Sequence, residues 1–165
     1  MKTAHSPSQV DLRIHTASAM QRLAAQVGRA LQIGDVVGLT GPLGAGKTTF
    51  VQGLAEGLDV PAERHVASPT FALVNEHPGR IDFVHVDFYR IRSPAELPEL
   101  GIEEAYDRAA TAIEWAERFP DWLPADTLHL TLEIETDGTR MLHARSSGPR
   151  SQALLGVLAT TDPEN

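Results

Sequence analysis

The chain of 165 residues contains no cysteine. This absence excludes disulfide bonds, zinc clusters built on thiolates and a cysteine nucleophile, and nothing indicates an oxidising compartment. Long hydrophobic runs are missing too: no stretch approaches the roughly 20 apolar residues of a membrane span. Residues 1–11 have no apolar run of the signal-peptide type. We therefore expect a cytoplasmic protein that makes no membrane contact.

Positive charge is also scarce. The chain has 14 Lys and Arg against 22 Asp and Glu, a formal net charge of −8, and its one small basic group is Arg90 with Arg92. Proteins that bind nucleic acid by themselves usually present a basic surface, so direct binding of RNA or DNA is not expected. An acidic surface fits a subunit that docks on a basic partner.

The size and composition favour one folded domain. Hydrophobic residues make up 42% of the chain, enough for a core, and 165 residues suit one compact unit. We predict a single domain over residues 1–165 whose polar tail, from about residue 160, is frayed.

Periodicity predicts an α/β fold. Thr16 is placed to cap a helix whose apolar stripe has helical spacing. The stripe comprises Met20, Leu23, Ala24, Val27 and Leu31. A short apolar run predicts a strand at 36–40 that is buried on both faces, and a helix is predicted over 48–58. Ser93 with Pro94 indicates another helix start. Further strands are predicted at 10–15, 71–76, 81–87, 109–115, 127–135 and 141–145, with hairpin turns at 77–80 and 137–138.

The loop from Gly41 to Thr48 carries the clearest chemistry. It matches G-x-x-x-x-G-K-[ST] at every fixed position, between a predicted buried strand and a predicted helix. Glycines let the backbone wrap phosphate oxygens, and the helix start turns its positive end to the same anion. Lys47 adds a full charge on the β- and γ-phosphates, and the Thr48 hydroxyl can ligate Mg²⁺. A glycine-rich turn that only connected a strand to a helix would not need Lys-Thr at its end. The sequence therefore predicts a P-loop NTPase, with a mixed β-sheet sandwiched between α-helices.

Two acids end predicted strands and are candidates to hold the metal: Asp87 and Glu114. Each could equally be a cap or a solvated side chain. A hydroxyl of the Ser68-Pro69-Thr70 segment could reach the γ-phosphate or its Mg²⁺, or form a turn.

Other residues near these positions have simpler interpretations. His85, two residues before Asp87, is more readily a structural histidine than a metal ligand. Trp115 is interpreted first as a core residue, and Arg90 and Arg92 as solvated.

Together these motifs resemble the bacterial TsaE (YjeE) ATPases. The resemblance rests on Leu43 to Phe50, Ser68 to Glu76, His85 to Arg90 and Ile113 to Trp115, in this order and spacing, and runs from about residue 16 to residue 138. It implies a role in making N6-threonylcarbamoyladenosine (t6A) in tRNA. It also implies binding to the TsaD–TsaB heterodimer, which transfers the threonylcarbamoyl group made available by TsaC-type synthases. ATP hydrolysis would reset that complex, and tRNA would be met only through it.

The resemblance also assigns residues. It makes Lys47, Thr70, Asp87 and Glu114 catalytic, with Thr70 as a switch residue, and Thr48, Asp87 and Glu114 the metal-binding set. The nucleotide-binding residues it implies are Gly41, Gly44, Ala45, Gly46, Lys47, Thr48, Thr49 and Trp115, with Thr16, Ala17 and Gly138 closing over the adenine. Two departures from the family pattern stand out: Pro42 replaces an acid or Asn, and Ala116 replaces a Pro.

Three functions are compatible with these residues. The leading hypothesis is an ATPase that hydrolyses slowly alone and is stimulated by its partner, because no catalytic base or arginine finger is obvious. A small-molecule kinase would need an acceptor pocket and a basic lid, for which the chain offers only Arg90 and Arg92. A non-enzymatic nucleotide sensor would not need both Asp87 and Glu114.

Overall fold

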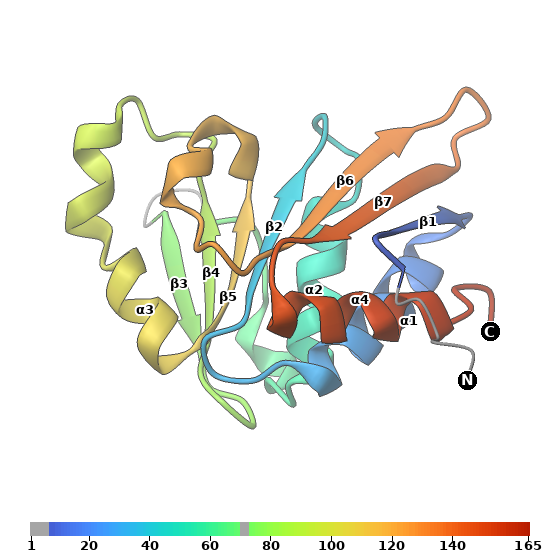
Figure 1. Ribbon diagram of the computed structural model, residues 1–165, viewed down its shortest axis with the longest axis horizontal. Helices are drawn as coiled ribbons and strands as arrows, with labels where there is room; N and C mark the ends of the chain where they lie inside the picture. Colours follow the sequence, from blue (N-terminus) through green and yellow to red (C-terminus); the bar gives the residue numbers. More distant parts are fainter. Residues whose placement is uncertain (1–6, 70–72) are drawn as a thin grey trace, which may run out of the picture.

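The computed structural model describes residues 7–69 and 73–165. In these residues seven strands form one mixed sheet in the order β1-β7-β6-β2-β5-β4-β3 (Figure 1). The strands are β1 (Gln9–Ile14), β2 (Val36–Thr40), β3 (Val74–His77), β4 (Phe83–Asp87), β5 (Ala110–Glu114), β6 (Leu128–Ile134) and β7 (Arg140–Ser146). The fold class predicted from the sequence is confirmed.

The middle of the sheet is parallel. Strand β2 lies between β5 and β6, and β5 continues to β4, all parallel. Strands β3, β7 and β1 extend the sheet by antiparallel pairs. Because the carboxyl ends of parallel strands meet at one edge, Asp87 of β4 stands opposite Glu114 of β5, and Glu114 opposite Leu39 of β2. This edge is where ligands bind in open α/β sheets.

Helices cover both faces of the sheet. The α-helices are α1 (Ala17–Ala30), α2 (Lys47–Gly57), α3 (Ile102–Arg108) and α4 (Pro149–Thr160), and the 3₁₀ segments are η1 (Ala62–Arg64), η2 (Pro94–Leu100), η3 (Ala116–Arg118) and η4 (Pro120–Trp122). One core joins α1, α2 and α4 to one face, and a second core gathers α3, η2 and η3 on the other face. Figure 1 shows α3 beside β3–β5, and α1 and α4 toward β1 and β7.

Helices α1 and α2 approach each other unusually closely. A Cβ atom added to Gly28 would lie 2.3 Å from the Leu54 carbonyl oxygen, and one added to Gly57 would lie 2.2 Å from that of Ala25. Only glycine permits such backbone contact. The Thr16 side chain caps α1 by accepting a hydrogen bond from the Ala19 amide at 3.0 Å, as predicted.

The main differences from the sequence-based prediction lie in the helices. The helix start predicted at Ser93 is a 3₁₀ segment with Pro98 inside it, and the Ser93 side chain makes no capping bond. A proline ring removes an amide donor and clashes with the preceding turn, so no regular α-helix forms there. Helices α3 and α4 were not predicted. Predicted residues 71 and 72 of β3 lie outside the described ranges.

Within the described ranges, no helix is both long enough and apolar enough to cross a membrane.

Candidate phosphate-binding site

The loop between β2 and α2 has the backbone of a phosphate cradle. Gly41 has φ of 150°, and a Cβ there would lie 2.5 Å from the Leu132 carbonyl oxygen. Gly46 has φ of 107° and directly precedes α2, which begins at Lys47. Glycine is needed at both positions, because side chains disfavour positive φ and the Gly41 site has no room for one. The first amides of α2 therefore face the pocket with no helical partner.

Lys47 is folded back onto this loop. Its ammonium donates hydrogen bonds to the carbonyls of Gly41 (2.6 Å) and Pro42 (2.9 Å), and it lies 4.1 Å from the Trp115 ring centroid. Burial lowers the pKa of Lys47, and the charges of Glu114, Glu117 and Asp87 oppose that change. The Pro42 carbonyl also accepts from the Ala45 amide at 3.1 Å. Pro42, which departs from the family pattern, therefore still contributes to the loop, because its carbonyl accepts both hydrogen bonds.

Glu114 is the centre of the buried polar cluster. Its carboxylate accepts hydrogen bonds from Thr48 (2.8 Å), from Ser68 (3.2 Å) and from His85 Nε2 (2.6 Å). Burial acts to raise the pKa of Glu114, but the hydrogen bonds from His85, Thr48 and Ser68 lower it overall. The Thr48 and Ser68 hydroxyl oxygens are 2.6 Å apart. The cluster therefore holds one negative charge beside the hydroxyl that the motif offers to a metal.

Asp87 lies next to this cluster at the end of β4. It is buried, and its Oδ1 accepts a hydrogen bond from the Tyr89 amide at 2.8 Å. Burial raises its pKa, the Tyr89 amide opposes this, and the charge of Glu114 adds to the rise. Two carboxylates in one pocket destabilise each other unless a cation lies between them. The pair is therefore suited to holding a metal ion.

Two adjoining pockets share the loop. The larger, about 340 Å³, contains Lys47, Thr48, Asp87 and Glu114, together with Ser68 and Trp115. The smaller, about 180 Å³, is lined by Thr16, Ala17 and Gly138, with Met20 and Arg140. Gly44, Gly46 and Thr49 line both pockets. The arrangement matches a phosphate chamber continued by a nucleoside chamber.

Every predicted site residue that the structure describes lines one of the two pockets, except Gly41, whose carbonyl accepts a hydrogen bond from Lys47. Thr70 lies outside the described ranges. Trp115 has φ of 58° and packs against Tyr89 with the rings tilted by 36° and their centroids 4.8 Å apart. Its ring packs against the core and also lines the phosphate chamber. Ala116 begins η3, a position where proline is readily accepted, and alanine there adds a backbone amide that proline lacks.

Sequence reasoning missed three contributors. His85, interpreted as a structural histidine and not as a metal ligand, donates a hydrogen bond to Glu114 and so belongs to the polar cluster of the site. Arg118 donates to the Phe88 carbonyl at 2.8 Å and to that of Tyr89, which fixes the segment after Asp87. Arg140 donates to the loop itself. The spacing between His85 and Asp87 could have indicated the first, because alternate residues of a strand share a face. Nothing local marks the two arginines.

The fold and this site define a P-loop NTPase. Comparison with known proteins refines that class. Residues 14–142 match the family described as "Threonylcarbamoyl adenosine biosynthesis protein TsaE", and the chain belongs to that family.

Relatives and a solved structure agree with this assignment. The tRNA threonylcarbamoyladenosine biosynthesis protein TsaE of Treponema pallidum is 40% identical over 126 residues, covering 76% of this chain and 92% of that protein. The Bacillus subtilis protein of the same name is 36% identical over 131 residues, covering 78% and 80%. The crystal structure of Bacillus subtilis YdiB superposes with a TM-score of 0.76 at 28% identity, covering 94% of this chain and 97% of the other.

Proposed function

We propose that this protein is an ATPase that supports t6A modification of tRNA by binding and resetting the TsaD–TsaB complex in the cytoplasm. The observation that carries the proposal is the hydrogen bond between Thr48 of the phosphate loop and Glu114, in the chamber that also contains Asp87. Membership of the TsaE family supplies the connection to t6A. The role of the other site residues follows from their positions around that bond.

The residues present fit ATP with Mg²⁺. Among the described residues no group of three His, Asp or Glu side chains could hold a metal alone. Magnesium in nucleotide sites is typically held by one or two protein groups together with phosphate oxygens and water. Thr48, Asp87 and Glu114 would hold it here, and when bound the ion would neutralise charge on the phosphates.

The chain's own groups have distinct tasks in this proposal. The first amides of α2 bind phosphate oxygens. Lys47 gives up its bonds to the Gly41 and Pro42 carbonyls and binds the phosphates instead. Thr16, Ala17 and Gly138 enclose the nucleoside, and Trp115 covers the phosphate chamber.

Turnover by the protein alone should be slow. Glu114 is already bonded to three side chains, which leaves it poorly suited to act as a free base. Among the described residues, Arg90 is the one arginine that lines the phosphate chamber, so the chain offers few groups that could stabilise charge on the γ-phosphate. Stimulation by TsaD–TsaB would then supply or order a missing group, as activating partners do for other P-loop proteins.

A reconstitution tests the proposal. ATP binding is measured by calorimetry and hydrolysis by phosphate release, with and without TsaD–TsaB, while t6A formation is followed on tRNA. Lys47→Ala should abolish binding, and Glu114→Gln should retain ATP but lose stimulated hydrolysis and repeated rounds of modification. A wild-type protein that hydrolyses ATP at a kinase-like rate without any partner, or that leaves t6A formation unchanged, would contradict it.

A further inference from the structure

Arg140 is the first residue of β7, and its guanidinium contacts the phosphate loop. Its Nε donates to the Ala45 carbonyl at 3.2 Å and one terminal nitrogen donates to the Gly44 carbonyl at 3.1 Å. The other terminal nitrogen donates to the Gly138 carbonyl in the turn of the β6–β7 hairpin. One side chain thus joins two consecutive peptides of the loop to a hairpin 95 residues further along the chain.

The bonds to Gly44 and Ala45 fix the orientation of two peptide planes. Described peptide bonds are all trans, and in a trans peptide the carbonyl and the following amide point in opposite directions. Holding the Ala45 carbonyl therefore directs the Gly46 amide the other way, away from the guanidinium. The amide that follows Gly44 donates to the Pro42 carbonyl at 3.1 Å, which closes the loop on itself.

No acidic side chain of the described residues neutralises the positive charge of Arg140. Among the described residues no carboxylate forms an ion pair with its guanidinium. A solvated arginine would normally keep its fork in water, whereas this one is partly buried and lines the nucleoside chamber. Arginine's planar fork suits two neighbouring acceptors, which a lysine ammonium cannot match.

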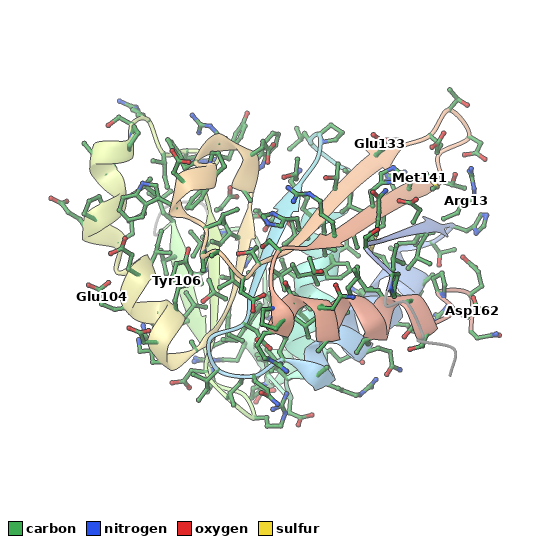
Figure 2. The ribbon with its side chains drawn as sticks, in the orientation of Figure 1. Arg13, Glu104, Tyr106, Glu133, Met141 and Asp162 are labelled. Atoms are coloured by element: carbon green, nitrogen blue, oxygen red, sulfur yellow. The ribbon has the colours of Figure 1, made fainter. Side chains whose placement is uncertain are left out.

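Neighbouring Arg13 provides a contrast on the same hairpin. It donates to the Thr139 hydroxyl at 3.2 Å, one residue from Gly138, and contacts no carbonyl of the phosphate loop. Figure 2 shows Arg13 of β1 with Glu133 and Met141 at the hairpin end of the three strands, and these residues stand opposite one another in the ladder. The two arginines therefore share the hairpin but differ in their contact with the loop.

We propose that Arg140 is a positioning residue for nucleotide binding: it sets the orientation of the Gly46 peptide and ties the phosphate loop to the β6–β7 hairpin. The inference rests on the proposed nucleotide site. Its effect falls on binding of any nucleotide that places a phosphate in the loop, because it acts on the loop backbone and not on the γ-phosphate alone.

The test compares Arg140→Met, Arg140→Lys and the matched control Arg13→Met. Calorimetry gives the dissociation constants for ATP and ADP with Mg²⁺, and thermal melts without nucleotide give stability. Arg140→Met should raise the dissociation constants for both ATP and ADP by about tenfold, because the charged hydrogen bonds that hold the loop are lost. Arg140→Lys should recover only part of this, because one ammonium cannot serve both carbonyls. Arg13→Met should stay within about twofold of wild type.

The kinetic readout separates positioning from stability. With ATP as substrate, Arg140→Met should raise KM while kcat at saturation stays near wild type. A general weakening of the hairpin would lower the melting temperature of both Met variants without changing affinity. If Arg140→Met fails to fold, Arg140→Lys alone still decides, because affinity equal to wild type overturns the inference.

Three outcomes would overturn the proposal. The first is an Arg140→Met affinity within about twofold of wild type. The second is full recovery by Arg140→Lys, which would leave only a charge effect. The third is a loss confined to ATP and absent for ADP. A wild-type protein that binds no nucleotide would instead refute the proposed function, so the two failures are distinguishable.

Discussion

The contact between His85 and Glu114 should give a large coupling energy when the free energy of unfolding is measured in a double-mutant cycle. The two side chains are buried and their atoms lie 2.6 Å apart. Because the carboxylate only accepts, His85 Nε2 carries the shared proton. We consider Glu114→Ala, His85→Leu and the double variant.

The structure sets the expected size of each change. Glu114→Ala leaves the His85 donor unpaired in the core, and the other ring nitrogen, Nδ1, already has no partner among the described residues. Breaking a buried pair by removing one member costs about 3–5 kcal/mol. His85→Leu leaves the Glu114 charge with two hydroxyl donors, which reduces the cost to about 2–3 kcal/mol. The double variant leaves neither group stranded, so it should cost about 2 kcal/mol less than the sum.

Urea unfolding, followed by the fluorescence of Trp115 and Trp122, gives the free energy of unfolding of the wild type, the two single variants and the double variant. Equal slopes against urea would confirm that the compactness of the unfolded state is unchanged, so that differences in midpoint report stability. Additive costs, within about 0.5 kcal/mol, would mean that the two groups do not interact and would refute the reasoning.

Three further predictions concern the rest of the fold. The buried Thr111 hydroxyl has no partner among the described residues, so Thr111→Val should raise the free energy of unfolding by about 1 kcal/mol, and a lower urea midpoint would contradict this. Gly57→Ala places a Cβ 2.2 Å from a backbone oxygen of α1 and should cost about 3 kcal/mol, whereas Gly156→Ala on α4, with nothing within 4 Å, should be neutral or stabilising. A hydrogen bond to Asp11 raises the pKa of His143 above its ordinary 6.5. Hydrogen bonds from Gln9 and then from His143 lower the pKa of Asp11 below 3.8. The stability that His143 contributes is therefore complete below pH 6.5 and is lost as pH rises through its raised pKa. The stability that Asp11 contributes is lost as pH falls through its lowered pKa. The decrease in melting temperature caused by His143→Gln should therefore be largest between pH 4 and 6.5 and should shrink in alkali.

Features encoded in short segments were predictable from the sequence. Strand β2 has the predicted bounds, Val36–Thr40, because an apolar run between a turn and a glycine loop admits few alternatives. The Thr16 cap and the Asp137-Gly138 turn, where Gly138 has φ of 85°, are likewise local chemistry. The proximity of Asp87 to Glu114 follows once both are placed on parallel strands.

Features that depend on distant segments were not predictable. Helix α4 has a proline at its first turn, but it is held by Asp126, whose carboxylate accepts from the Arg150 and Ser151 amides. Arg140 reaches the loop across 95 residues, and no periodicity encodes that contact. The spacing of His85 and Asp87 could place both on one strand face, but the bond from His85 to Glu114 depends on the register between β4 and β5. Such contacts exist only after the sheet has formed.

The glycine contacts between α1 and α2 have a mechanical consequence. The start of α1 contributes Thr16 and Ala17 to the nucleoside chamber, and the start of α2 carries the phosphate loop. Two helices locked backbone to backbone cannot slide past each other, since interiors this dense are stiff. The starts of the two helices, and the parts of both chambers that they line, therefore move together as one rigid unit. The segments carrying Ser68 and Tyr89 line the other side of the phosphate chamber and are not part of this unit, so a change in the width of that chamber would come from them.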